Sequence, residues 1–170
     1  LGWNGVCYNG DRLEMLKNIV EDRVSALLSG DLQSDYVKLF IKQEPHKKAK
    51  LDKGLYRLIS AVSPVDSLID RMLFGTYMDE VVENFQDYPC KIGWSPVKGG
   101  YRYISSLFDG KKTVCLDKSG WDWTVQEWLI DALEKFMLWT LPQDNDFART
   151  LFKARFDLLF RQTLFKFEDG

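Results

Sequence analysis

Two aspartates lie in the segment of this chain that is best suited to do chemistry. Residues 113–124 read TVCLDKSGWDWT, so an apolar run ends at Asp117, and Asp122 follows between Trp121 and Trp123. The run 113–116 predicts a short buried strand with Asp117 at its C-terminal end, where ligands gather at the rim of a sheet in mixed folds. Burying an unpaired carboxylate there is costly, and a divalent cation is one way to offset that cost.

The chemistry that such a carboxylate supports is metal-assisted. Mg²⁺ prefers oxygen ligands and is commonly held by one or two carboxylates together with substrate phosphates and water. The pattern therefore indicates phosphoryl or nucleotidyl transfer with Asp117 as a metal ligand. The pair taken alone also fits a turn cap at Asp117 and a surface charge at Asp122. A haloacid-dehalogenase-type site would need an aspartate at position 119, which is a serine.

A second candidate site is the basic segment 42–57. It contains six basic and two acidic side chains, a local charge of +4, in a chain whose net charge is −2. We predict a loop between two strands that attracts phosphate groups, with an ordinary solvated lysine loop as the alternative. An arginine in a strand-like run can grip a phosphate or stack on a base. The basic residues are Lys42, Lys47, Lys48, Lys50, Lys53 and Arg57.

The elements that must position these residues are predicted from hydrophobic periodicity. Helices and strands are mixed without strict alternation, which favours the α+β class. Ser63 is the expected N-cap of a helix with Pro64 at its first position, and Thr124 with Glu127 has the spacing of a capping box. We expect strands at 36–42, 56–62, 113–116 and 163–167, helices at 11–29, 63–85, 125–141 and 144–161, and loops at 43–54 and 89–103.

Composition narrows the class of protein. The 170 residues are 45% hydrophobic, enough for a core. Three cysteines without metal-ligand spacing indicate free thiols in a reducing compartment, and a single histidine excludes a multi-histidine metal site. No apolar run is long enough for a membrane span, and no signal peptide is recognisable.

The two ends of the sequence lead us to expect a fragment. The first residue is not Met, and the last predicted strand runs into a turn without a return strand.

The two candidate sites together resemble a known family. Residues 40–75, FIKQEPHKKAKLDKGLYRLISAVSPVDSLIDRMLFG, resemble motif F and the following helix of viral RNA-dependent RNA polymerases, and residues 115–128, CLDKSGWDWTVQEW, resemble motif A. Residues 93–96, GWSP, and the glycines at 99–100 are similar to a loop of the sobemovirus-like and polerovirus-like group. The resemblance extends over about residues 36–170, and its elements occur in the family's order.

The resemblance implies a fold and an activity. The fold would be a partial right-hand polymerase, with residues 1–112 in the fingers, including the basic loop 42–57, and residues 113–170 in the first part of the palm. The activity would be addition of NTPs to an RNA 3′ end on an RNA template by two-metal-ion transfer. The family's Ser-Gly and Gly-Asp-Asp motifs are absent, so we expect the isolated chain to be inactive.

The resemblance also implies roles for individual residues. Asp117 would bind both catalytic Mg²⁺ ions, with Mn²⁺ as a substitute, and Asp122 would recognise the ribose 2′-OH of the incoming nucleotide. Arg57 would contact that nucleotide's base or triphosphate, and Glu44 would brace the loop by pairing with a cation. The path of the nucleotide would be lined by Lys42, Lys47, Lys48, Lys50 and Lys53. Trp123 and Trp128 are expected to pack and so hold the aspartate turn rigid.

The implied partners are template RNA, the nascent strand, NTPs and other viral replication proteins. The implied location is the host cytoplasm, at membrane-associated replication complexes. Reverse transcriptase is a weaker alternative, because a bulky aromatic residue usually takes the place of Asp122 there. Two further alternatives stay open, a non-catalytic RNA-binding module and a decayed, endogenised polymerase remnant.

Overall fold

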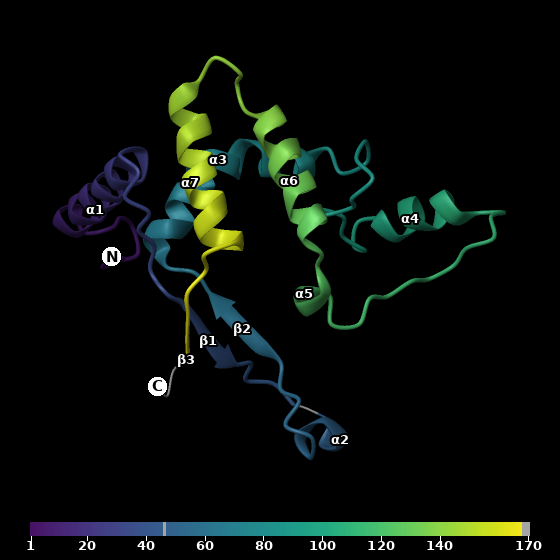
Figure 1. Cartoon of the computed structure of the whole chain (residues 1–170). Coiled ribbons are helices and arrows are strands. Elements are labelled where there is room, and N and C mark those ends of the chain that lie inside the picture. Colours follow the sequence, from purple (N-terminus) through teal and green to yellow (C-terminus); the bar gives the residue numbers. More distant parts are fainter. Residues whose placement is uncertain (46, 168–170) are drawn as a thin grey trace. The chain divides into compact units, whose positions relative to one another are not determined.

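The computed structural model describes residues 1–45 and 47–167, and these form two compact units (Figure 1). The first unit joins residues 1–73 to residues 133–170, and the second comprises residues 74–132. The chain thus leaves the first unit and later returns to it. Residues 113–170, which we expected to belong together, are divided between the units. The assignment of fingers and palm to these segments stays a prediction.

The core of the first unit is built by α1 (Gly10–Leu28), the first half of α3 (Pro64–Glu83) and α7 (Asp146–Phe160), and each of these helices starts at a local sequence signal. Helix α1 is capped by Asn9, whose side chain accepts a hydrogen bond from the Arg12 amide. In α3 the Ser63 hydroxyl accepts from the Asp66 amide at 3.2 Å, as predicted. Helix α7 is capped by Asn145. Each cap satisfies an amide that the helix itself leaves without a partner.

The core of this unit lies where the three helices meet. Helix α1 contributes Val24 and Leu27, α3 contributes Ile69, and α7 contributes Leu151, Ala154 and Leu158. Ile69 and Leu27 have almost no exposed surface. Apolar side chains spaced three and four residues apart are therefore buried in the last turns of α1 and along α7, where burial removes their surface from water.

A three-stranded sheet extends from these helices. Strand β1 (Val37–Ile41) pairs antiparallel with β2 (Leu58–Ala61) and parallel with β3 (Phe165–Phe167), in the order β2-β1-β3. One helical turn, α2 (Lys48–Leu51), interrupts the segment expected to be a loop and lies at the far end of the β1–β2 hairpin (Figure 1). The turn predicted after β3 falls at 168–170, outside the described residues.

The second unit contains a close-packed loop and an unpredicted helix. Helix α4 (Gly100–Phe108) begins inside the segment 89–103 that we expected to be a loop. The Trp94 indole donates to the Gly100 carbonyl at 2.8 Å. A Cβ on Gly100 would collide with the Ser95 carbonyl oxygen, and one on Gly93 with that of Val82. At Gly93 and Gly100 the backbones thus approach too closely for any side chain.

Two predictions about the aspartate segment are wrong. Residues 113–116 form no strand, because no described segment pairs with them, and Val114 and Leu116 are 83% and 89% exposed. A strand needs a hydrogen-bonded neighbour, which the local sequence cannot supply. The capping box is also absent, since the Thr124 hydroxyl donates to the Gly120 carbonyl at 3.1 Å instead. Thr124 ends the short helix α5 (Trp121–Thr124), and α6 (Glu127–Thr140) follows.

Candidate functional site

The two aspartates lie on an exposed turn of the second unit. Asp117 ends an extended stretch, and Asp122 lies in the first turn of α5. Gly120 between them has φ 63°, a left-handed conformation that glycine adopts without strain. Its carbonyl accepts from the Trp123 amide at 3.0 Å, which closes the turn. Backbone geometry, and not burial at a sheet rim, therefore sets the spacing of the two carboxylates.

The tryptophans near this turn do not pack as expected. Trp123 is 78% exposed and Trp128 is 67% exposed, so the prediction that they hold the turn rigid is wrong. Sequence reasoning missed Trp121, whose ring lies 4.2 Å from the Lys118 ammonium. This cation–π contact links the residue after Asp117 to the residue before Asp122. A lysine and a tryptophan three residues apart were the available signal.

The carboxylates fit part of a Mg²⁺ site. Among the described residues, no three acidic, histidine or cysteine side chains cluster tightly enough to hold a metal ion. Carboxylate oxygens nevertheless suit Mg²⁺, which takes few protein ligands when substrate phosphates and water complete its shell. Asp117 is exposed and can contribute to such a shared site. The aspartate segment therefore supplies a ligand and not a whole protein cage.

In the first unit, Glu44 organises the base of the basic loop. Its two carboxylate oxygens lie 2.8 Å from the Lys42 ammonium and 2.8 Å from the Arg57 guanidinium. The hydrogen bond from Lys42, and then that from Arg57, hold the pKa of Glu44 below its ordinary value. The expectation that Glu44 braces the loop by pairing with a cation is confirmed, and Glu44 pairs with two.

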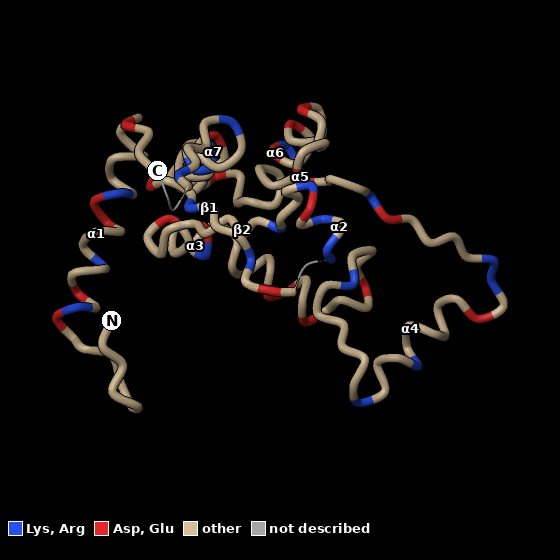
Figure 2. The backbone as a smooth tube through the Cα atoms, turned by 90° about the horizontal axis from the view of Figure 1, so that it is seen from below, with Lys and Arg blue, Asp and Glu red and all other residues tan. Residues whose placement is uncertain are grey.

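The remaining lysines lie at the tip of the hairpin, on and around α2. Lys47 precedes the helical turn, Lys48 and Lys50 lie within it, and Lys53 follows, all of them exposed. In the part of the chain that the structure describes, no acidic side chain forms an ion pair with these four, and Figure 2 shows the basic residues gathered there. The tip is thus a concentrated positive charge that a phosphate-rich ligand can reach.

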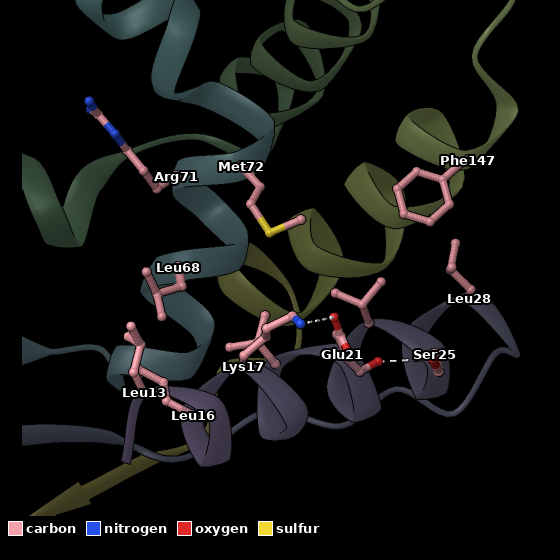
Figure 3. A pocket seen from close by; sticks show the side chains of 12 residues that line it. Leu13, Leu16, Lys17, Glu21, Ser25, Leu28, Leu68, Arg71, Met72 and Phe147 are labelled. Carbon is pink, nitrogen blue, oxygen red and sulfur yellow. Dashed lines mark hydrogen bonds and ion pairs between the residues drawn. The ribbon is translucent and has the colours of Figure 1, made fainter. Parts of the chain in front are cut away.

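An open apolar groove lies elsewhere, between α1, α3 and α7. Its volume is about 860 Å³, and its walls include Leu13, Leu16, Leu68, Met72 and Phe147 (Figure 3). None of the predicted site residues lines it. The groove therefore does not mark the site at which the predicted chemistry would occur.

Comparison with known proteins decides the family. The family model described as viral RNA-dependent RNA polymerase matches residues 11–167. The chain belongs to this polymerase family. The match includes the basic loop and both aspartates, so both candidate sites lie inside the family's shared sequence.

Similar proteins include replicases of plant viruses and a mushroom virus. The polymerase segment is 45% identical over 116 residues to the replicase polyprotein P2AB of Southern cowpea mosaic virus, which covers 64% of the chain and 12% of that protein. It is 36% identical over 148 residues to the P2AB of Southern bean mosaic virus, covering 80% and 14%. It is 36% identical over 102 residues to the RNA-directed RNA polymerase of mushroom bacilliform virus, covering 58% and 24%.

The segment thus spans between about one eighth and one quarter of the length of these relatives. No solved structure matches the chain significantly. Within residues 1–45 and 47–167, no helix is both long and apolar enough to cross a membrane. Because no solved structure matches, the family assignment rests on the sequence match.

Proposed function

We propose that this chain is part of an RNA-directed RNA polymerase that joins NTPs to the 3′ end of a growing RNA on an RNA template. The observation that carries the proposal is the family match across residues 11–167, which includes the basic loop and both aspartates. The aspartate turn is exposed, and so are the lysines at the loop tip, as a site for phosphate-bearing substrates requires. The fold would be a partial right-hand polymerase.

Asp117 would be a ligand of catalytic Mg²⁺, or of Mn²⁺ in its place. Bound in a pair, these ions would lower the pKa of the attacking 3′-hydroxyl and stabilise the charge that develops on the leaving pyrophosphate. The carboxylate of Asp117 is exposed and forms no ion pair with any basic residue that the structure describes, so it can reach such ions directly. Asp122 would accept a hydrogen bond from the ribose 2′-hydroxyl of the incoming nucleotide.

The basic loop would guide the nucleotide triphosphate. Glu44 holds Lys42 and Arg57 in fixed directions at the base of the loop, so that Arg57 can contact the triphosphate or base. The four lysines at the tip would attract the triphosphate by long-range charge, an effect that salt screens. We place the protein with template RNA and other viral replication proteins in the host cytoplasm, at membrane-associated replication complexes.

The test is the change Asp117→Asn in a polymerase that contains this chain. RNA synthesis should fall by roughly a thousandfold or more, because a metal ion stabilises the transition state by several kcal/mol. RNA binding should persist. The matched control is Asp109→Asn, an exposed aspartate of the same unit, which should leave synthesis unchanged.

The leading alternative is a non-catalytic RNA-binding module built on the same segment. It would explain the lysines at the loop tip but gives no role to the aspartate turn. If Asp117→Asn left RNA synthesis at the level of the Asp109→Asn control, Asp117 would have no part in catalysis. The binding module would then be the better account.

A further inference from the structure

Two lysines lie directly opposite each other in the sheet. Lys38 on β1 and Lys166 on β3 are cross-strand partners in the parallel pair, and both side chains are exposed. Like charges at this position destabilise a sheet. Neither lysine forms an ion pair with any of the described acidic residues. A bound anionic ligand would neutralise the two ammonium groups and so remove their repulsion. A repulsive pair of this kind is therefore expected at a site that binds anions.

The face of the sheet that carries this pair has the character of a nucleic-acid surface. Side chains alternate along a strand, so Tyr36, Lys38, Phe40 and Lys42 share one face. On β2, Ala61 lies opposite Lys38, and Ile59 lies opposite Phe40. Tyr36 is 56% exposed. On this face the aromatic rings and ammonium groups along β1 alternate, β2 adds apolar side chains, and β3 adds Lys166.

A hollow of about 590 Å³ opens on this face, at the end of the hairpin far from α2. Lys38, Lys166 and Tyr36 line it together with the chain around Ser63. Asp35 lines it as well. The Asp35 carboxylate is held by the Arg23 guanidinium at 3.2 Å, and among the described residues no acidic side chain pairs with either lysine.

We propose that this face of the sheet binds the phosphodiester backbone of RNA, with Lys38 and Lys166 contacting phosphates in the hollow. The inference rests on the proposed polymerase function. Lys42 lies four positions after Lys38, or about 13 Å along an extended strand. Lys42 and Arg57 share the single carboxylate of Glu44, so a net positive charge continues from the hollow toward the basic loop. A track of this length suits a chain of phosphates better than one nucleotide. Tyr36 offers a ring on which a base can stack.

The experiment measures binding of the 170-residue chain to a fluorescein-labelled oligouridylate as salt is varied. Each phosphate contact on a single strand contributes about 0.7 to the slope of log K against log salt, so Lys38→Met with Lys166→Met should lower the slope by about 1.4. The matched control, Lys135→Met with Lys153→Met, removes the same charge from exposed positions on α6 and α7. That control should leave the slope within error of the parent chain.

A second variant separates binding from folding. Lys166→Glu places opposite charges across the strands, so it should raise the melting temperature while weakening RNA binding. Equal slopes for the two double variants, an unchanged slope, or no RNA binding by the parent chain at low salt would each overturn the proposal. Competition by ATP would also overturn the proposal. If ATP displaced the RNA, and if Lys38→Met with Lys166→Met abolished ATP binding, the hollow would be a nucleotide site.

The outcome is distinguishable from failure of the proposed polymerase function. Asp117→Asn reports on synthesis and should not change the salt slope. A lowered slope in the Lys38 and Lys166 variant, with synthesis unaffected by Asp117→Asn, would support the RNA surface without the catalytic role. A normal slope together with loss of synthesis in Asp117→Asn would support only the catalytic role.

Discussion

Arg155 on α7 grips Asp70 on α3 with two hydrogen bonds, from Nε at 2.8 Å and from the guanidinium NH2 at 2.9 Å. The two residues are 85 positions apart, and Arg155 is only 2% exposed. Burial disfavours the charge of Arg155, but the hydrogen bonds to Asp70 and the charges of Asp70 and Asp66 outweigh it and raise the pKa of the guanidinium. The pair fixes the returning segment of the chain against the first unit.

The Arg155 guanidinium also lies 3.6 Å from the Asp66 carboxylate, and this carboxylate holds the base of the β1–β2 hairpin. Asp66 is 1% exposed, and its carboxylate accepts from Arg23 at 3.0 Å and from the Asp35 amide at 3.1 Å. Asp35 lies just before β1, and Asp66 lies in the helix that follows β2. Buried charges therefore join the segments before and after the hairpin that carries the basic loop.

Removing the buried arginine should destabilise the first unit strongly. We expect Arg155→Met to lower the free energy of unfolding by about 3–5 kcal/mol, because Asp66 and Asp70 lose their shared cation while remaining partly or fully buried. Chemical denaturation measures this difference. Lys153→Met, an exposed change on the same helix, should shift stability by less than about 0.5 kcal/mol. Similar losses in the two variants would contradict the role given to the network.

Acid should weaken the hairpin base through Asp35. The hydrogen bond from Ser63, followed by that from Arg23 and its charge, holds the pKa of Asp35 below its ordinary value. A lowered folded-state pKa gives stability that is present above the unfolded-state pKa of roughly 4 and is lost as pH falls through the folded value. The carboxylate is 45% exposed, so the contribution should be at most about 1 kcal/mol.

The variant Asp35→Asn tests this pH dependence. It should be less stable than the parent chain at neutral pH, and the difference should shrink as the pH falls below 4. Urea midpoints measured across this range give the comparison. A difference that stayed constant with pH would show that the charge of Asp35 contributes nothing.

Gly93 and Gly100 in the second unit should not tolerate a methyl group. Gly100→Ala would drive a Cβ into the Ser95 carbonyl, and Gly93→Ala would do the same at Val82 while also straining a φ of 101°. We expect each change to cost about 1–3 kcal/mol. Gly10→Ala is the control, since its Cβ would meet nothing within 4 Å. Thermal unfolding measures the difference. A melting temperature of Gly100→Ala equal to that of the parent chain would mean that the loop is not closely packed.

Glu44 should matter for substrate affinity in a polymerase that contains this chain. Glu44→Gln leaves Lys42 and Arg57 to repel each other and lose their fixed directions. The KM for NTPs should therefore rise several-fold, with a smaller change in kcat. Glu83→Gln removes an exposed charge at the end of α3 and should change neither constant. Steady-state kinetics with each NTP decides, and a fall in kcat alone would argue against the assigned role.

Asp122 should set the choice of sugar. If its carboxylate accepts a hydrogen bond from the ribose 2′-hydroxyl, Asp122→Ala should reduce the preference for NTPs over dNTPs by roughly tenfold, the value of one hydrogen bond to a charged group. Competition between the two substrates in one reaction measures the ratio. Should the preference stay at the parent value, the 2′-hydroxyl must be read elsewhere.

The sequence by itself determined the features that depend on neighbours along the chain. Ser63 caps a helix as its sequence predicts, and the strands on both sides of the basic loop are predicted from hydrophobic periodicity. Glu44 lies close enough to Lys42 in sequence for their pairing to be expected. These features form because a helix or a hairpin satisfies its backbone hydrogen bonds locally.

Only the tertiary structure decided the contacts between distant segments. The run 113–116 has the composition of a strand but pairs with no described segment, whereas β3 becomes a strand because β1 pairs with it in parallel. The Asp70–Arg155 pair and the opposed Lys38 and Lys166 depend on that same return of the chain. Such pairings follow from which surfaces are buried together, a property of the whole packed unit that no local pattern of residues encodes.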